Sequence, residues 1–251
     1  MSLNPRRMSR WKAAGIHLLL SVAIAAAVVA FMLTVWYPWP LFEAAGGSHL
    51  ILILVGVDVT LGPLITLIVF KSGKKGLKFD LTVIALCQIA AIAYGIHTLY
   101  LARPIYIVFT VDRFELVTAK DIDPQDLPKV TRPEFKSLPL GRPRYIAAVA
   151  PDDENEKLKL IDSAMKGKDL QVYPQYYVPY QQEAANALTR AKDMSILIKR
   201  NPEAVRKALK SLDRSQESVK FLPMRAPQTD GAILLDAKSG APLDIVLMEA
   251  W

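Results

Sequence analysis

Hydrophobic residues form three long runs in the first part of the chain, at positions 16–36, 49–70 and 79–100. Each run is close to the length of about 20 residues that an α-helix needs to cross a hydrocarbon core about 30 Å thick. A helix of that length in a soluble protein would show a polar stripe along one face. The pattern therefore predicts three transmembrane helices within a membrane domain at residues 1–102.

After this region the pattern changes to shorter stretches that alternate between strand-like and helix-like. Strands rich in β-branched and aromatic residues are predicted at positions 105–111, 144–150, 219–224, 232–236 and 243–248, the last two joined by a hairpin around Lys238-Ser239-Gly240. Helices are predicted at 152–168, at 181–192 and from Pro202, which Asn201 precedes as a cap. Residues 121–143 are rich in proline and predict an irregular loop. The fold class expected for residues 103–251 is α+β.

Charge gives the membrane helices an orientation. The net charge is +7, and most of the basic excess lies in two clusters: Arg6, Arg7, Arg10 and Lys12, and then Lys71, Lys74, Lys75 and Lys78. Positive residues beside spans favour the cytoplasmic side, so residues 37–47 and 103–251 are expected on the periplasmic side. Trp36, Tyr37 and Trp39 are expected in an aromatic belt at the outer surface. Because the basic residues flank membrane segments, nucleic-acid binding loses its main support.

The first apolar run is too long for a typical signal peptide. The run has about 21 residues, whereas the hydrophobic region of a usual signal peptide has about 7–15 residues. We therefore expect a signal anchor that is retained and not cleaved. Met8 is an alternative start to Met1.

The chain offers little of the chemistry that enzymes use. Its three histidines, at positions 17, 49 and 97, lie in or beside the apolar runs, and its single cysteine, Cys87, lies within the third. Residues 103–251 therefore lack the side chains of the usual zinc sites and of Ser-His-Asp or Cys-His sites. No glycine-rich phosphate-binding motif is present. We expect no catalytic residue, metal, cofactor or small-molecule substrate.

Asp58 is the exception within the apolar runs. A carboxylate in the middle of a span costs about 2.5–3.5 kcal/mol on insertion scales, so it needs a partner. With residue 50 as the outer end of the second helix, Tyr94 is the best match in depth, followed by Gln88 and His97. One interpretation is a polar contact that fixes the second and third helices to one another. The alternatives are a contact with the helix of another protein and a catalytic carboxylate, the last weakened because no second acidic residue lies at that depth.

Two features are candidates for binding a partner. Gly62 and Pro63 follow Asp58 by about one turn, and together they permit a kink and the close approach of another helix. A kink alone also has a purely structural explanation. The second feature is a group of four tyrosines, Tyr173, Tyr176, Tyr177 and Tyr180. Tyrosine is favoured at interfaces, but the same rings can instead fix an irregular loop to the domain core.

Three stretches, GVDVTLGPLITLIVF, LKFDLTVIALCQ and ARPIYIVFTVDRFELV, resemble the type IV pilin accessory proteins of the TfpX/TfpZ family. The likeness is strongest over residues 8–125. It implies a multi-pass protein of the bacterial inner membrane with a periplasmic domain, which acts as an accessory or chaperone-like factor for a major pilin. The pilin would be held through its helix, its head or both. The matching positions are Asp58, Gly62, Pro63, Asp80, Arg103, Pro104, Asp112, Arg113, Phe114 and Glu115.

The leading hypothesis is thus a non-enzymatic factor that binds a type IV pilin and promotes its assembly into pili. The alternative is a membrane-anchored periplasmic sensor or regulatory subunit of an envelope complex. That alternative is weakened because the predicted cytoplasmic segments are too short to hold an output domain.

Overall fold

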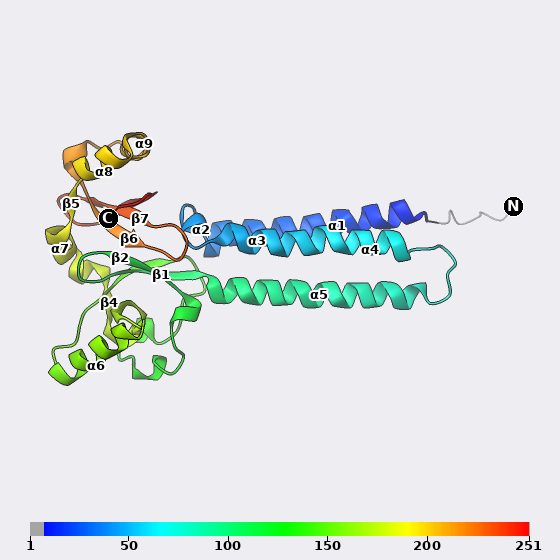
Figure 1. The fold of residues 1–251 in the computed structure, drawn as a ribbon, viewed down its shortest axis with the longest axis horizontal. Helices are drawn as coiled ribbons and strands as arrows, with labels where there is room; N and C mark the ends of the chain where they lie inside the picture. The colour runs from blue at the N-terminus through cyan, green and yellow to red at the C-terminus, as the bar shows by residue number, and fades with distance from the viewer. Residues whose placement is uncertain (1–7, 251) are drawn as a thin grey trace. The chain divides into compact units, whose positions relative to one another are not determined.

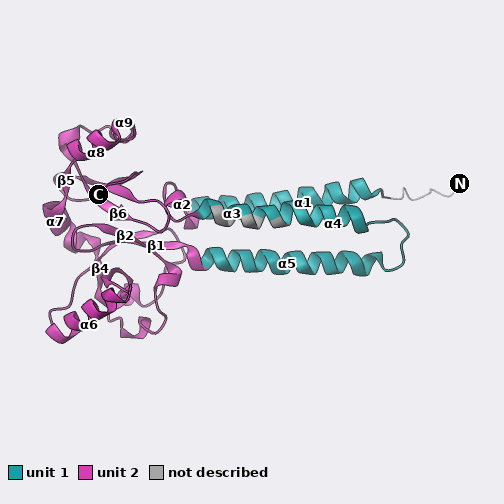
Figure 2. Ribbon diagram, viewed as in Figure 1, with its two compact units in different colours: residues 1–34, 47–100 teal, residues 35–46, 101–251 magenta. Residues whose placement is uncertain are grey.

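The structure is a computed structural model that describes residues 8–250, apart from the side chains at positions 49, 50, 53, 54 and 57. Met1, Arg6 and Arg7 lie outside the described residues. The chain divides into two compact units (Figure 2). We call residues 1–34 and 47–100 the helical unit, and residues 35–46 and 101–251 the sheet unit.

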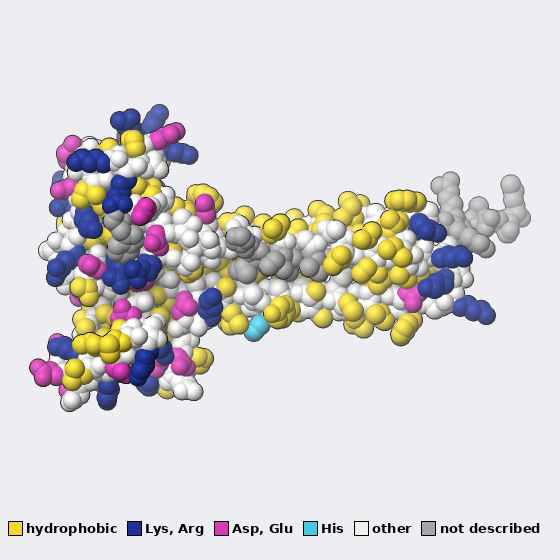
Figure 3. Space-filling model, viewed as in Figure 1, with side chains coloured by type: hydrophobic (Ala, Val, Ile, Leu, Met, Phe, Trp, Pro, Cys, Tyr) yellow, Lys and Arg dark blue, Asp and Glu magenta, His cyan; other side chains and the backbone are white. Residues whose placement is uncertain are grey.

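Two long apolar helices match the first and third predicted apolar runs in length and composition. Helix α1 (Arg10–Phe31) begins after Ser9, whose Oγ accepts a hydrogen bond from the backbone N–H of Lys12, and it continues into the π-helical turn η1 (Met32–Trp36). Helix α5 (Leu77–Ala102) is the second. The stretches Arg10–Trp36 and Leu77–Ala102 are both long and apolar enough to cross a membrane. Hydrophobic side chains cover most of the visible face of these helices, as Figure 3 shows.

The middle segment differs from the prediction of an uninterrupted helix. It consists of α3 (Gly47–Val55), a π-helical stretch η2 (Gly56–Leu61) and α4 (Gly62–Val69). Among the described residues, the structure therefore shows two helices of span length and not three. The physical reason lies at Pro63, which has no N–H to donate and whose ring clashes with the carbonyl one turn earlier. A π-helical turn accommodates such a clash without ending the helical path.

Within the helical unit, α4 and η2 lie alongside α1 (Figure 1). The chain then turns through Gly73 and Gly76, both with positive φ, before α5 begins. In this turn the Lys74 ammonium contacts the Asp80 carboxylate at 2.6 Å.

The sheet unit confirms the predicted α+β class. Within the described residues, eight strands form one mixed sheet in the order β4-β3-β1-β2-β6-β7-β8, with β5 paired to β6. The pairs β1/β3 and β2/β6 are parallel and the others are antiparallel. The strands are β1 (Pro104–Phe109), β2 (Phe114–Thr118), β3 (Arg144–Ala148), β4 (Tyr177–Pro179), β5 (Lys192–Asp193), β6 (Val219–Arg225), β7 (Gly231–Asp236) and β8 (Pro242–Leu247).

In the described part of the chain, five α-helices accompany this sheet: α2 (Leu41–Ala44), α6 (Glu154–Met165), α7 (Tyr180–Arg190), α8 (Met194–Arg200) and α9 (Pro202–Ser211). As predicted, α9 is capped by Asn201, whose Oδ1 accepts from the N–H of Ala204 at 3.1 Å. The proline-rich region holds only the short 3-10 turns η3 (Ala119–Asp121), η4 (Leu127–Lys129) and η5 (Pro133–Phe135). Strand β2 and helix α8 were not predicted. β2 is buried along its whole length although it contains Glu115 and Thr118, so its residues form neither a continuous apolar run nor a regular alternation of apolar and polar.

Hydrophobic side chains pack on both faces of the sheet. On one face, Phe109, Leu116 and Ile233 pack with residues of α7. On the other face, Val108, Val117 and Ile146 pack with the irregular segments; this second cluster includes Val130, Phe135, Leu170 and Tyr177. Helices α8 and α9 cover a third cluster beside β6, β7 and β8.

Residues 35–46 belong to the sheet unit, although they were predicted as part of the membrane domain at residues 1–102. Leu41 and Ala44 are buried in the first cluster, and the Ala44 carbonyl accepts from the N–H of Gln228 at 3.0 Å. Tyr37 is also completely buried and packs edge-on against Phe42. The expectation that Tyr37 belongs to an interfacial aromatic belt is therefore wrong, because a buried ring cannot face lipid headgroups.

Candidate functional site

Four polar side chains from distant parts of the chain meet inside the helical unit. They are His17 of α1, Asp58 of η2, Thr66 of α4 and Gln88 of α5, which we call the polar cluster. His17 Nδ1 lies 2.6 Å from Thr66 Oγ1, and His17 Nε2 lies 2.6 Å from Gln88 Oε1. Gln88 Nε2 donates to Asp58 Oδ1 at 3.2 Å. The cluster thus links α1, η2, α4 and α5.

These contacts form one directed chain of hydrogen bonds. Because the Gln88 amide N–H donates to the Asp58 carboxylate, its oxygen is the atom that accepts from His17 Nε2–H. In the neutral imidazole, His17 Nδ1 is then left to accept the hydroxyl hydrogen of Thr66. In an apolar surrounding without water, such internal pairing is what allows polar side chains to be buried. Asp58 and Thr66 are both buried.

Gly62 makes room for this arrangement. A Cβ atom at this position would lie 1.9 Å from Gln88 Nε2 and 3.2 Å from His17 Nε2. Both Gly62 and Pro63 are buried within the helical unit. The close approach expected at Gly62 is therefore made by the protein's own α5.

Of the three partners that depth suggested for Asp58, the structure brings only Gln88 to it. Tyr94 is 74% exposed and His97 is exposed, and neither contacts the Asp58 carboxylate. The depth estimate took the second helix to begin at residue 50, whereas α3 begins at Gly47. It also considered only the third helix, and so missed His17. A histidine inside the first apolar run was the available signal.

The four tyrosines of the sheet unit separate into two pairs. Tyr177 and Tyr180 are buried, and their hydroxyls donate to the carbonyls of Gln171 and Gly240, respectively. Tyr177 also packs edge-on against Tyr106, with 5.4 Å between ring centroids. These two rings fix the loop to the core, which is the structural alternative stated above.

Tyr173 and Tyr176 instead line a pocket. Their rings meet edge-on with centroids 6.2 Å apart. The pocket has a volume of about 340 Å³, and we call it the tyrosine pocket; its other lining residues are Lys129, Glu156, Lys159, Leu160 and Gln175. Aromatic rings beside both signs of charge suit a polar polypeptide surface.

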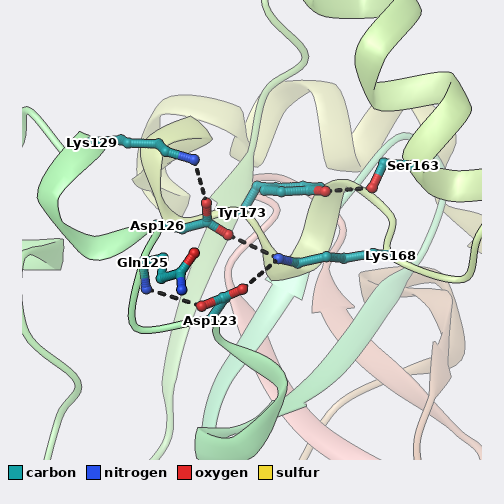
Figure 4. Close-up of polar contacts among 7 residues, drawn as sticks. All are labelled: Asp123, Gln125, Asp126, Lys129, Ser163, Lys168 and Tyr173. Carbon is teal, nitrogen blue, oxygen red and sulfur yellow. Dashed lines mark hydrogen bonds and ion pairs between the residues drawn. The ribbon is translucent and has the colours of Figure 1, made fainter.

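A network of ion pairs holds one wall of this pocket (Figure 4). Asp126, only 4% exposed, accepts from Lys129 Nζ at 2.7 Å and from Lys168 Nζ at 3.0 Å. Lys168 also pairs with Asp123 and lies over the Tyr173 ring, 5.0 Å from its centroid. The Tyr173 hydroxyl is hydrogen-bonded to Ser163. Burial acts to raise the pKa of Asp126, but the hydrogen bonds from Lys129 and Lys168 outweigh it and hold that pKa below its usual value.

Helix α6, which forms part of the pocket, also carries an exposed apolar surface. Leu158, Ile161 and Met165 of α6 are all exposed, and their spacing places them on one helical face. Exposed apolar groups of this size in a folded unit are typical of a surface that another protein covers.

The remaining positions of the sequence resemblance lie mostly where the chain enters the sheet. Arg103 is fully buried and its Nη2 donates to the Pro139 carbonyl at 3.2 Å, and Pro104 begins β1. Arg113 Nε donates to the buried Glu115 at 2.6 Å, and its guanidinium also contacts Asp112. Phe114 belongs to the first core cluster. Burial raises the pKa of Glu115 although the Arg113 guanidinium opposes the shift.

Comparison with known proteins gives the family. The family model "Fimbrial assembly protein FimB" matches residues 5–46. The chain is 31% identical over 220 residues to the fimbrial assembly proteins of serogroups I and E1 of Dichelobacter nodosus, with 85% of each chain covered. It is 37% identical over 121 residues to the protein of serogroups C1 and C2, which covers 47% of this chain and 92% of that one. No solved structure matches. The narrower TfpX/TfpZ assignment stays a prediction, but similarity at this level over most of both chains shows that the protein belongs to the FimB family of fimbrial assembly proteins.

Proposed function

We propose that this protein is a non-enzymatic, chaperone-like accessory factor that binds a type IV major pilin in the bacterial inner membrane and promotes its assembly into pili. The observation that carries the proposal is the likeness, over 85% of the chain, to proteins named for fimbrial assembly. A pilin waiting for assembly has a long apolar helix and a globular head. A protein with membrane helices and an outer folded unit can contact both parts, and two linked contacts reinforce each other through effective concentration.

In this proposal, α1 with η1, the segment α3–η2–α4, and α5 all cross the membrane. Residues 47–69 follow one helical path in which η2 replaces a few α-helical bonds. The Asp58 carboxylate, which would oppose insertion, has Gln88 as a partner. The basic residues Arg10 and Lys12 before α1, and those between α4 and α5, then face the cytoplasm, and the sheet unit lies in the periplasm.

The tyrosine pocket and the exposed face of α6 are the proposed contact with the pilin head. The pocket combines two aromatic rings with Lys129, Lys159 and Glu156, and α6 supplies both a pocket wall and an apolar surface. A small ligand would fill the pocket but would leave Leu158, Ile161 and Met165 uncovered. This favours a protein partner over the ligand of a sensor.

The polar cluster has a supporting role in this proposal. Asp58, Gly62 and Pro63 are engaged within the helical unit, so they shape it and do not themselves bind the pilin. The pilin helix would instead contact the lipid-facing side chains of α5, such as Leu86, which is exposed.

Site-specific photocrosslinking in cells that make the cognate pilin tests this function. A crosslinker at Tyr176, and a second at Leu86 of α5, should trap the pilin. The matched control is Lys238, which is exposed on the β7–β8 hairpin and outside the pocket, and should give little product. Capture of only unrelated proteins at both Tyr176 and Leu86 would contradict the proposal.

A further inference from the structure

Two residues that mark the ends of the span-length helices contact the same short loop. Trp36 is the last residue of η1, and its indole Nε1–H donates to the carbonyl of Leu140 at 3.0 Å. Arg103 directly follows α5, and its Nη2 donates to the carbonyl of the neighbouring Pro139 at 3.2 Å. All four residues belong to the sheet unit, so these contacts lie within one compact body.

Because the chain is continuous, these contacts fix the position of the loop relative to the ends of the membrane helices. Wherever the sheet unit turns relative to the helical unit, Trp36 and Arg103 lie at the points where the chain leaves the helices. A loop that is hydrogen-bonded to both must therefore stay beside the same surface of the bilayer. Arg103 is fully buried, which makes its contact with the loop a fixed part of the sheet unit.

Two large apolar side chains close in sequence to these contacts are exposed. Leu140 is 66% exposed and Trp39, three residues after Trp36, is 72% exposed. In water, the exposure of large apolar side chains such as these is unfavourable. At the boundary between headgroups and acyl chains, leucine and tryptophan are favoured, because the boundary removes apolar area from water and still offers partners for the indole N–H.

We propose that Leu140 and Trp39 insert into the outer interfacial layer of the bilayer, so that the sheet unit is held to lipid by a contact additional to its two covalent connections. The inference rests on the membrane topology of the proposed function. Such a contact limits how far the sheet unit tilts on the membrane, and with it the directions in which the tyrosine pocket can meet the pilin head. The exposed face of α6, which the proposed function assigns to the pilin head, serves as a contrasting surface.

Fluorescence quenching of the full chain in lipid nanodiscs tests this contact. In a Cys87→Ala background, a single cysteine replaces Leu140, Met165 or Leu20, and each is labelled with an environment-sensitive fluorophore. The nanodiscs contain phosphatidylethanolamine and phosphatidylglycerol, with or without nitroxide-bearing lipids. Leu140 and Met165 are both exposed, so neither change disturbs the core, and Leu20 of α1 reports on insertion of the helix.

The proposal expects blue-shifted emission and several-fold greater quenching at position 140 than at position 165. Strong quenching at position 20 with equal, weak quenching at 140 and 165 would overturn the loop contact and leave the membrane topology standing. Weak quenching at all three positions would overturn both. A response at position 140 that required added pilin would assign this surface to a protein, and would also overturn the lipid contact. A cysteine at Trp39 provides a second reading of the same surface and should behave as position 140 does.

Discussion

Gln88 of α5 donates a hydrogen bond to the carboxylate of Asp58 in η2 at 3.2 Å, across thirty positions of sequence. This contact places a polar bond between two segments whose other side chains are mostly apolar. Because His17 occupies the remaining acceptor of the same amide, Gln88 is the residue on which the polar cluster depends. The cluster therefore offers several tests of how the helical unit is held together.

Replacing Gln88 with leucine should destabilise the helical unit. The substitution removes the side-chain partner of the Asp58 carboxylate and one of the two partners of the His17 ring, and each unsatisfied buried group costs about 1–3 kcal/mol. Thermal unfolding in detergent should show a lower transition temperature. The matched control is Tyr94→Leu on the same helix, because Tyr94 is exposed and does not contact Asp58. An equal loss of stability in both variants would show that the cluster does not hold the helices.

Gly62→Ala should disturb the same contact by steric clash alone. The new methyl group would lie 1.9 Å from Gln88 Nε2, so α5 or its side chain must move, and overpacking of this kind costs about 1–3 kcal/mol. Gly56→Ala is the control, because a Cβ atom there meets no atom within 4 Å. Crosslinking between engineered cysteines on α4 and α5 would report the displacement. Unchanged crosslinking in Gly62→Ala would show that the approach of Gln88 is not tight.

Acid should weaken the sheet unit through Asp126. Its folded-state pKa lies below its ordinary value, so the ionised carboxylate stabilises the fold at neutral pH. That contribution is present above the ordinary carboxyl pKa, about 3.9, and is lost as the pH falls from there through the lower folded-state value. Unfolding of the wild type should therefore grow easier across this window. Asp126→Asn should be less stable at neutral pH and should lack this part of the acid dependence, while the exposed Asp162→Asn should keep it.

The two pairs of tyrosines should give opposite results. Tyr176→Ala removes a wall of the tyrosine pocket, and is expected to reduce pilin capture and piliation while the sheet unit stays folded. Tyr177→Ala empties a buried site between Tyr106 and Phe135, and should destabilise the sheet unit by about 3–5 kcal/mol, as for other large aromatic residues. Circular dichroism melting and a piliation assay separate the two effects. Normal piliation in a stable Tyr176→Ala protein would rule the pocket out as the pilin contact.

Leu41 tests whether the segment between the first two helical stretches belongs to the sheet unit. Its side chain is buried in the first core cluster, so Leu41→Ala should cost the sheet unit about 2–5 kcal/mol. Leu140→Ala changes the same type of residue at an exposed site, and should leave unfolding almost unchanged. Thermal melting of both variants gives the comparison. No effect of Leu41→Ala would mean that residues 35–46 do not contribute to that core.

Much of the architecture was open to prediction because its signals are local. The long apolar runs that became α1 and α5 are readable directly, since a helix that crosses lipid needs a continuous run of apolar side chains. Helix α9 was predicted from Asn201 and Pro202, which mark its start, and the hairpin between β7 and β8 was predicted from its turn residues. Strand β2 was not predicted, because burial on both sheet faces removes the regular alternation of apolar and polar residues on which prediction of a half-buried strand depends.

The sequence by itself determined the apolar segments and the α+β character of the second unit. Only the tertiary structure decided that His17, Asp58 and Gln88 meet, that Leu41 and Tyr37 lie in the sheet unit, and that Tyr176 lines a pocket while Tyr177 is buried. Hydropathy depends on each residue and its near neighbours. Which polar side chains face one another depends on the rotation and packing of segments far apart in the chain, and that information exists only once the chain has folded.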